Sequence, residues 1–97
     1  MIVNKIVDPD HRLILVLCDV SVHGKKIEDG NLQLDLSSDF YKGEESNGSD
    51  IIKLFDKAYI VHAVGKQSVA LCVEHNVLER DKIRTIKGIP YAYMVGC

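Results

Sequence analysis

Residues 59–76, with the sequence YIVHAVGKQSVALCVEHN, decide the fold because they join a strand directly to a helix. The run 59–64 is almost wholly apolar, which is typical of a buried strand. After the glycine, apolar residues recur at helical spacing and predict a helix over about 66–76. The first turn of a helix has amide groups without helical partners, and it carries the positive end of the helix dipole. We therefore expect an anion site at the turn, with the candidate residues Gly65, Lys66 and Ser68.

This turn resembles only the end of a nucleoside-triphosphate phosphate loop. The complete loop needs a glycine five residues before Gly65, where Ile60 stands, and a Ser or Thr directly after the lysine, where Gln67 stands. The nucleotide interpretation is therefore rejected. Two interpretations remain: a weaker anion site, or a glycine that only permits a tight strand-to-helix turn.

Length and composition indicate one globular domain, residues 1–97. The chain is 46 % hydrophobic and 27 % charged, which is ordinary for such a domain. We expect a cytoplasmic protein without membrane contact, because apolar runs fall short of the roughly 18 residues of a membrane span and no secretory signal is recognisable. Cys18 and Cys72 are predicted to be buried thiols, and Cys97 is predicted to be exposed. The spacing of the three cysteines is typical neither of a disulfide framework nor of a zinc site. We expect no metal and no cofactor.

The other elements follow from local patterns. Residues 2–7 and 13–17 flank a turn and predict a hairpin, whose second strand is apolar throughout and therefore buried on both faces. Leucines at 32, 34 and 36 alternate with polar residues and predict a strand with one buried face. A helix is expected over about 50–58, capped by Ser49 or Asp50. The Phe40-Tyr41 pair is expected to fold onto the core; the alternative is that the two rings form part of a binding surface.

The chain closes with two predicted strands, at 82–86 and 91–95. The order of elements predicts an α+β (mixed α/β) fold, in which a single sheet of about five or six short strands is packed by two helices at about 50–58 and 66–76. The terminal strand is predicted as a sheet edge that would pair with a second copy in a homodimer.

Three further residues are candidates for the anion site or for acid–base chemistry. His62 lies in an apolar strand, where it is either a core side chain or a ligand or proton-transfer group. Asp19 ends a buried strand and is either a general base or a capping residue of the loop. Lys25 lies in a polar, glycine-punctuated loop. No nucleophile–base pair can be assembled from these residues, so no catalytic residue is assigned.

The charge distribution suggests a contact surface for a partner. Residues 1–50 hold ten acidic and five basic side chains, whereas residues 51–97 hold four acidic and seven basic ones. The segment 80–87 carries a net charge of +3, and two tyrosines follow it. Basic groups beside aromatic rings are typical of surfaces that bind RNA, although the sequence pI of about 6.0 is low for an independent nucleic-acid binder. The candidate contact residues are Arg80, Lys82, Arg84, Lys87 and Tyr91.

Several short motifs occur together in an order that is specific. They are Cys18-Asp19, Gly24-Lys25, Gly30, Phe40-Tyr41-x-Gly43, Val64-Gly65 and Gly88-Ile89-Pro90-x-Ala92. In this order the chain resembles, from about residue 11 to 95, a small archaeal family known as domain of unknown function 424. The resemblance implies a stand-alone, compact, cytoplasmic archaeal protein without an established activity. Members tend to carry Asn and His at the positions where this chain has His62 and Tyr91.

These observations predict a non-catalytic binding or accessory module. It is expected to dock a macromolecular partner, a protein or a ribonucleoprotein related to RNA or translation, through Gly65, Lys66 and the basic segment 80–87. The alternative is a small-molecule anion or phosphate binder, or a modest enzyme, centred on the Gly65-Lys66 turn.

Overall fold

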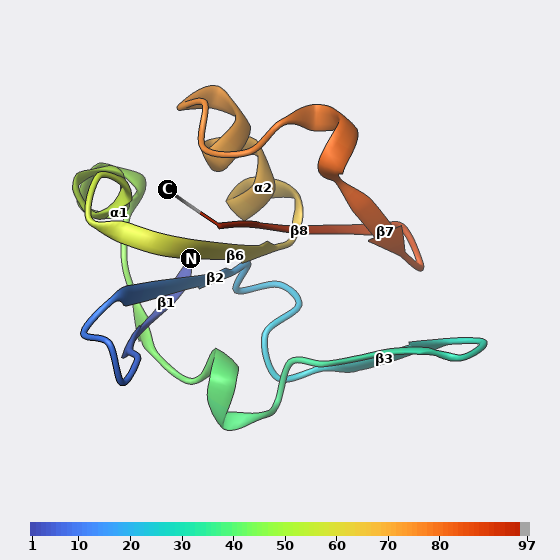
Figure 1. Ribbon diagram of the computed structural model, residues 1–97. Coiled ribbons are helices and arrows are strands. Elements are labelled where there is room, and N and C mark those ends of the chain that lie inside the picture. The colour runs from blue at the N-terminus through green and yellow to red at the C-terminus, as the bar shows by residue number, and fades with distance from the viewer. Residues whose placement is uncertain (96–97) are drawn as a thin grey trace.

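A computed structural model describes residues 1–95 (Figure 1). Its elements in chain order are β1 (Ile2–Val7), β2 (Leu13–Cys18), β3 (Lys26–Asp29), β4 (Leu32–Asp35), the 3₁₀ turn η1 (Asp39–Tyr41), β5 (Glu44–Glu45), α1 (Gly48–Phe55), β6 (Ala58–Val64), α2 (Lys66–Glu74), the 3₁₀ turn η2 (Arg80–Lys82), β7 (Arg84–Ile86) and β8 (Ile89–Val95). Six strands form one sheet in the order β5-β1-β2-β6-β8-β7, and β3 and β4 form a separate hairpin. The α+β prediction is confirmed. The terminal Cys97 lies outside the described residues.

Two parallel strands, β2 and β6, lie at the centre of the sheet and fix the positions of the elements that follow them. The side chains of β2 are buried on both faces: Leu15 and Leu17 join one core cluster, and Val16 joins the other. A continuous apolar run is what such a strand needs, so this prediction is confirmed. The register pairs Cys18 with Val64, and both strands therefore end at the same level of the sheet.

The two faces of the sheet are covered by different elements. Figure 1 shows α1 and α2 on one side, and the β3–β4 hairpin with η1 on the other. The helices bury Ile51, Val69 and Cys72 against the sheet. On the opposite side Tyr41 is buried, as predicted for the aromatic pair, whereas Phe40 remains 39 % exposed.

Four predictions on strands and helices need correction. The β3–β4 hairpin is separate from the main sheet. The predicted burial of one face at 32–36 holds only at the C-terminal end, where Leu36 is buried, because Leu32 is 53 % exposed. The first helix spans Gly48–Phe55 instead of about 50–58: it begins two residues earlier, with Asn47 as its cap, and ends before Ala58, which belongs to β6. The second helix ends at Glu74 rather than near residue 76, because Asn76 has a left-handed backbone (φ 61°) that interrupts the helix.

The prediction that the terminal strand is a sheet edge is wrong. The chain turns back at Lys87 and Gly88, both with positive φ, and β7 then pairs with β8 through residues 89–91. Strand β8 is thus internal, with β6 on its other side along residues 91–95. The edges are β5 and β7, and a homodimer stays a prediction. Among residues 1–95, no helix combines the length and the apolar character that crossing a membrane requires.

The cap of α1 gives a direct test of this boundary. The Asn47 side chain accepts a hydrogen bond from the Asp50 amide (3.0 Å), so Asn47→Ala should lower the free energy of unfolding by about 1 kcal/mol. Urea denaturation measures the change. The matched control is Ser49→Ala, an exposed site inside the first turn, which should change stability by less than about 0.5 kcal/mol. Equal losses in the two variants would contradict the assignment.

Candidate functional site

The turn between β6 and α2 is filled by a side chain from another strand. Asp19 follows β2 and is only 5 % exposed. One carboxylate oxygen accepts a hydrogen bond from the Gln67 amide at 2.9 Å, and the other accepts bonds from the amide and hydroxyl of Ser68, each at 2.7 Å. A carboxylate in this position satisfies helix N-terminal amides and interacts favourably with the helix dipole. Asp19 is therefore the long-range cap of α2.

Gly65 permits this contact through both its backbone and its missing side chain. Its φ of 106° lies in a region that favours glycine. A Cβ added to Gly65 would lie 2.2 Å from the Asp19 Cγ, so any larger residue would displace the carboxylate. The Gly65 amide donates to the Pro90 carbonyl at 2.8 Å, which fastens the turn to β8 as well.

This geometry corrects the expectation for the turn. The amides of Gln67 and Ser68 were predicted to be open to an external anion, but the Asp19 carboxylate already occupies them. Ser68 is fully buried, so it also cannot meet a ligand at the surface. Asp19 is a capping residue, as one of the two interpretations predicted. It caps helix α2, whose Gln67 lies 48 residues away, and not its own loop. The exposed side chains of this turn are those of Lys66 and Gln67.

Removing the cap should destabilise the protein strongly. Asp19→Ala leaves the buried amide and hydroxyl of Ser68 and the part-buried amide of Gln67 without their partner, and we expect a loss of about 3 to 5 kcal/mol in the free energy of unfolding. Ser68→Ala removes only one donor and should cost about 1 kcal/mol. Chemical denaturation measures both. Asp56→Ala, an exposed acidic site at the end of α1, is the control and should stay within about 0.5 kcal/mol of the native chain.

A second cluster joins His62 to the aromatic pair beneath the sheet. The Tyr41 hydroxyl and the His62 Nε2 are 2.9 Å apart, and the Phe40 ring lies edge-on to both rings. Burial lowers the pKa of His62 below its ordinary 6.5 and raises the pKa of Tyr41 to about 12. His62 is therefore a hydrogen-bonded, largely buried side chain that favours its neutral form.

The lowered pKa of His62 makes stability depend on pH. In the unfolded chain the imidazole gains its proton near its ordinary pKa of about 6.5, whereas the folded state resists protonation. Stability that is fully present above pH 6.5 should therefore fall as the pH drops from 6.5 towards the lower folded-state pKa.

Urea denaturation of the native chain and of His62→Gln, from about pH 8 to about pH 5, tests this dependence. The substitution should make stability fall less steeply as the pH drops, because it removes the imidazole of His62. The other three histidines are present in both proteins, so their contribution is the same in each. An unchanged pH slope in His62→Gln would contradict the assignment.

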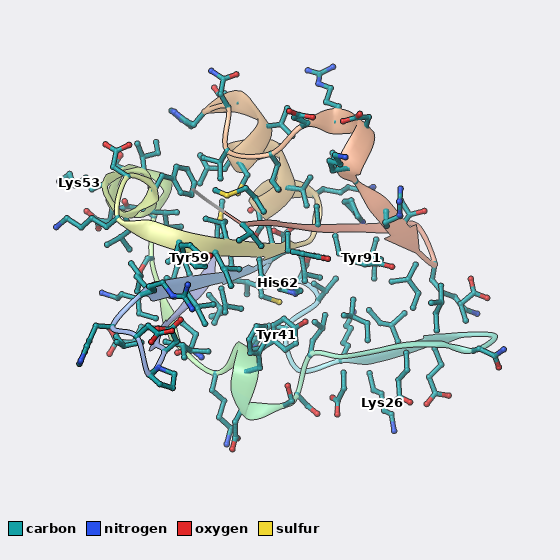
Figure 2. The ribbon with its side chains drawn as sticks, in the orientation of Figure 1. Lys26, Tyr41, Lys53, Tyr59, His62 and Tyr91 are labelled. Atoms are coloured by element: carbon teal, nitrogen blue, oxygen red, sulfur yellow. The ribbon has the colours of Figure 1, made fainter. Side chains whose placement is uncertain are left out.

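The most promising surface for a partner lies where β7 meets β8. Register pairs Arg84 with Tyr91, so the two side chains are neighbours on one face, and Tyr93 follows on the same face. A cavity of about 350 Å³ is lined by Lys82, Arg84, Tyr91, Ala92 and Tyr93. Tyr93 is 66 % exposed. We call Lys82, Arg84, Tyr91 and Tyr93 the basic–aromatic patch. In Figure 2, Tyr91 lies on the side of the sheet that faces the β3–β4 hairpin, as Tyr41 and His62 do.

The cations of the C-terminal half are available for contacts. Within residues 1–95, ion pairs engage lysines and arginines only at positions 12, 26, 42 and 53. The basic side chains that take part in none of these pairs include Lys66, Arg80, Lys82, Arg84 and Lys87. All five are exposed. None of the five therefore forms an ion pair with a carboxylate of residues 1–95.

The structure separates the predicted site residues into groups. Lys82, Arg84 and Tyr91 come together in the patch, although Lys82 lies in η2 and not on the predicted strand. Arg80 and Lys66 line another cavity, along α2, and Lys87 lies in the β7–β8 turn. Lys25 is an exposed residue of the loop before β3.

Sequence reasoning missed one residue of the patch and one contact of the His62 cluster. Tyr93 was not among the candidate contact residues, although its spacing of two from Tyr91 places both on one strand face. The partnership of Tyr41 with His62 spans 21 residues and had no local signal.

The fold and these surfaces define a small α+β domain with a basic–aromatic patch on a mixed sheet. The family described as "Protein of unknown function (DUF424)" matches residues 7–96, and the chain belongs to this family, as its motifs predicted. The crystal structure of an uncharacterized conserved protein from Methanopyrus kandleri is similar, with a TM-score of 0.75 and 20 % identity over 99 % of this chain and 92 % of that chain. Identity at this level shows a shared fold. No curated protein matches the chain significantly.

Proposed function

We propose that this protein is a non-catalytic module that binds single-stranded RNA through the basic–aromatic patch. The observation that carries the proposal is the convergence of two cations and two tyrosines on one cavity at the β7–β8 side of the sheet. Aromatic rings on a sheet surface stack on unpaired bases, and neighbouring lysines and arginines neutralise phosphates. The exposed ring of Tyr93 and the half-buried ring of Tyr91 supply the stacking surfaces.

Charge supports RNA at this surface despite the acidic composition of the chain. The net charge of −2 arises from the acidic first half, whereas the patch belongs to the basic second half. The cations at 82 and 84 have no carboxylate partner among the described residues. With so few phosphate contacts, the affinity should be modest and its dependence on salt shallow.

A protein partner with an acidic segment is the competing interpretation. It would use the same cations but would not need flat stacking surfaces at both tyrosines. The two can therefore be separated by comparing substitutions at the rings with substitutions at the cations.

Fluorescence anisotropy with labelled single-stranded RNA of about twelve nucleotides tests the proposal. Tyr93→Ala should weaken binding by roughly 5- to 100-fold through lost stacking. Arg84→Ala should weaken binding to all sequences and make the dependence on salt shallower by roughly one phosphate contact. Both side chains are exposed, so the fold should persist.

The control is Lys53→Ala on α1, which removes one positive charge on another part of the surface and should leave RNA binding unchanged. Two results would contradict RNA as the ligand: no saturable binding at about 50 mM salt, or equal binding by the native chain and both patch variants. Loss of binding in Arg84→Ala with none in Tyr93→Ala would favour an acidic protein partner instead.

A further inference from the structure

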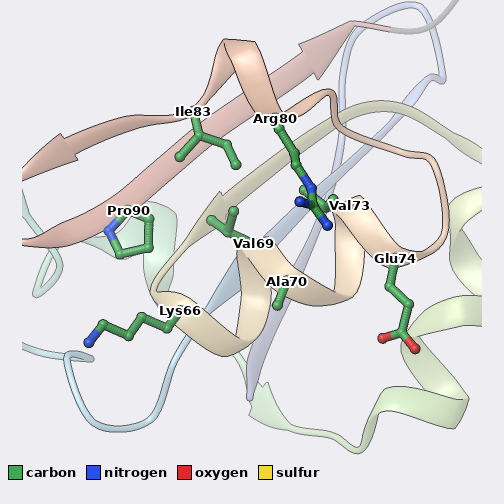
Figure 3. Close-up of a pocket in the computed structure, with 8 residues that line it drawn as sticks. All are labelled: Lys66, Val69, Ala70, Val73, Glu74, Arg80, Ile83 and Pro90. Atoms are coloured by element: carbon green, nitrogen blue, oxygen red, sulfur yellow. The ribbon is translucent and has the colours of Figure 1, made fainter.

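An apolar groove runs along α2, separate from the basic–aromatic patch. Its volume is about 660 Å³, within the range of sites for small organic ligands. Helix α2 contributes Val69, Ala70 and Val73 to it, and the chain returning to the sheet contributes Ile83 and Pro90. Figure 3 shows the Val69 and Ile83 side chains facing one another between the helix and the 80–90 segment.

The groove is open because the helix has more apolar surface than the sheet can cover. Residues 69 and 72 are buried against the sheet, whereas residues 70 and 73 lie on the flank of the helix, at helical spacing from Lys66. Ala70 is exposed and small, which leaves space over the flank. An uncovered apolar flank bounded by charged residues is typical of a ligand site.

Charged groups stand at both ends of this groove. Lys66 lies at the N-terminal end of α2, and Arg80 and Glu74 lie at the other end; the three groups sum to one positive charge. Figure 3 shows the Arg80 side chain extending across to Val73 and the Glu74 side chain pointing away from the groove. Neither cation is held in an ion pair within residues 1–95.

We propose that this groove binds a small organic anion with an apolar body and one carboxylate or phosphate group. The apolar body lies over Val69, Ala70 and Ile83, where its burial supplies the main driving force. The anionic group lies beside Arg80, whose planar guanidinium forms paired hydrogen bonds with a carboxylate or phosphate. Lys66 adds attraction from the other end, and Glu74 opposes the anion. The overall charge of +1 matches a monoanion.

The groove is independent of the surface proposed to bind RNA. The groove and the patch have no lining residue in common. Arg80, a candidate RNA contact by its sequence, lines the groove and not the basic–aromatic patch. Variants of one site therefore serve as controls for the other, and either proposal can fail alone.

Titration of the ¹⁵N-labelled chain followed by NMR tests the proposal with defined probes. Octanoate and 2-naphthoate carry the predicted carboxylate, and octyl phosphate carries the alternative anionic group. Octanamide and 2-naphthamide have nearly the same shapes without the charge, and acetate has the charge without the apolar body. We expect saturable shifts of amides in α2 and at 80–83 with the apolar anions, and binding at least about tenfold weaker for the amides and for acetate.

Four variants locate the site. Ala70→Trp fills the groove from an exposed position and should abolish saturable binding, and Arg80→Gln should weaken it by about tenfold. Glu74→Gln should tighten it, because a repelling carboxylate is removed. Arg84→Gln, in the basic–aromatic patch, should leave it unchanged.

Any of three results would overturn the proposal. These are no saturable binding of the apolar anions below about 10 mM, equal affinity for acids and amides, or perturbed amides that map outside α2 and 80–83. If Ala70→Trp does not fold, the opposite effects of Arg80→Gln and Glu74→Gln decide the question, because a site elsewhere would respond to neither.

Discussion

The Asp19 carboxylate accepts hydrogen bonds from the amides of Gln67 and Ser68, and this contact joins the end of β2 to the start of α2. It exists because β2 and β6 are parallel neighbours that end at the same level. The carboxylate after one strand therefore meets the helix that follows the other. Gly65 leaves the space, and its bond to the Pro90 carbonyl brings β8 to the same corner. The position of α2, and hence of the groove beside it, depends on this junction.

The contact between Asp19 and α2 decides which parts of the helix stay exposed, and the groove lies beside these parts. With its first amides bonded inside the molecule, α2 offers its apolar flank and the Lys66 side chain to solvent instead of an anion-binding end. The chain then crosses through η2 and returns along β7, which places Arg80 at the groove and Arg84 beside Tyr91. Arg80 and Arg84 are four residues apart but line different surfaces, because Arg80 begins the 3₁₀ turn η2 and Arg84 begins β7.

The spacing of apolar residues along the sequence predicted the individual buried strands and helices of this fold. The unbroken apolar run 13–17 indicated a strand covered on both faces, and the strand–glycine–helix sequence at 59–76 indicated the β6–α2 unit. The role of Asp19 could not be predicted in this way, since its partners are 48 and 49 residues away. Strand order was equally hidden: the last strand of the chain is internal because a two-residue turn folds β7 onto its outer side.

Amide hydrogen exchange at Gln67 and Ser68 tests the central contact most directly. If the Asp19 carboxylate holds both amides, their exchange should be as slow as that of neighbouring helical amides, and addition of inorganic phosphate should shift neither resonance. Fast exchange of these two amides in the native chain, or a saturable phosphate-induced shift at both, would show that the helix start is open and would contradict the account.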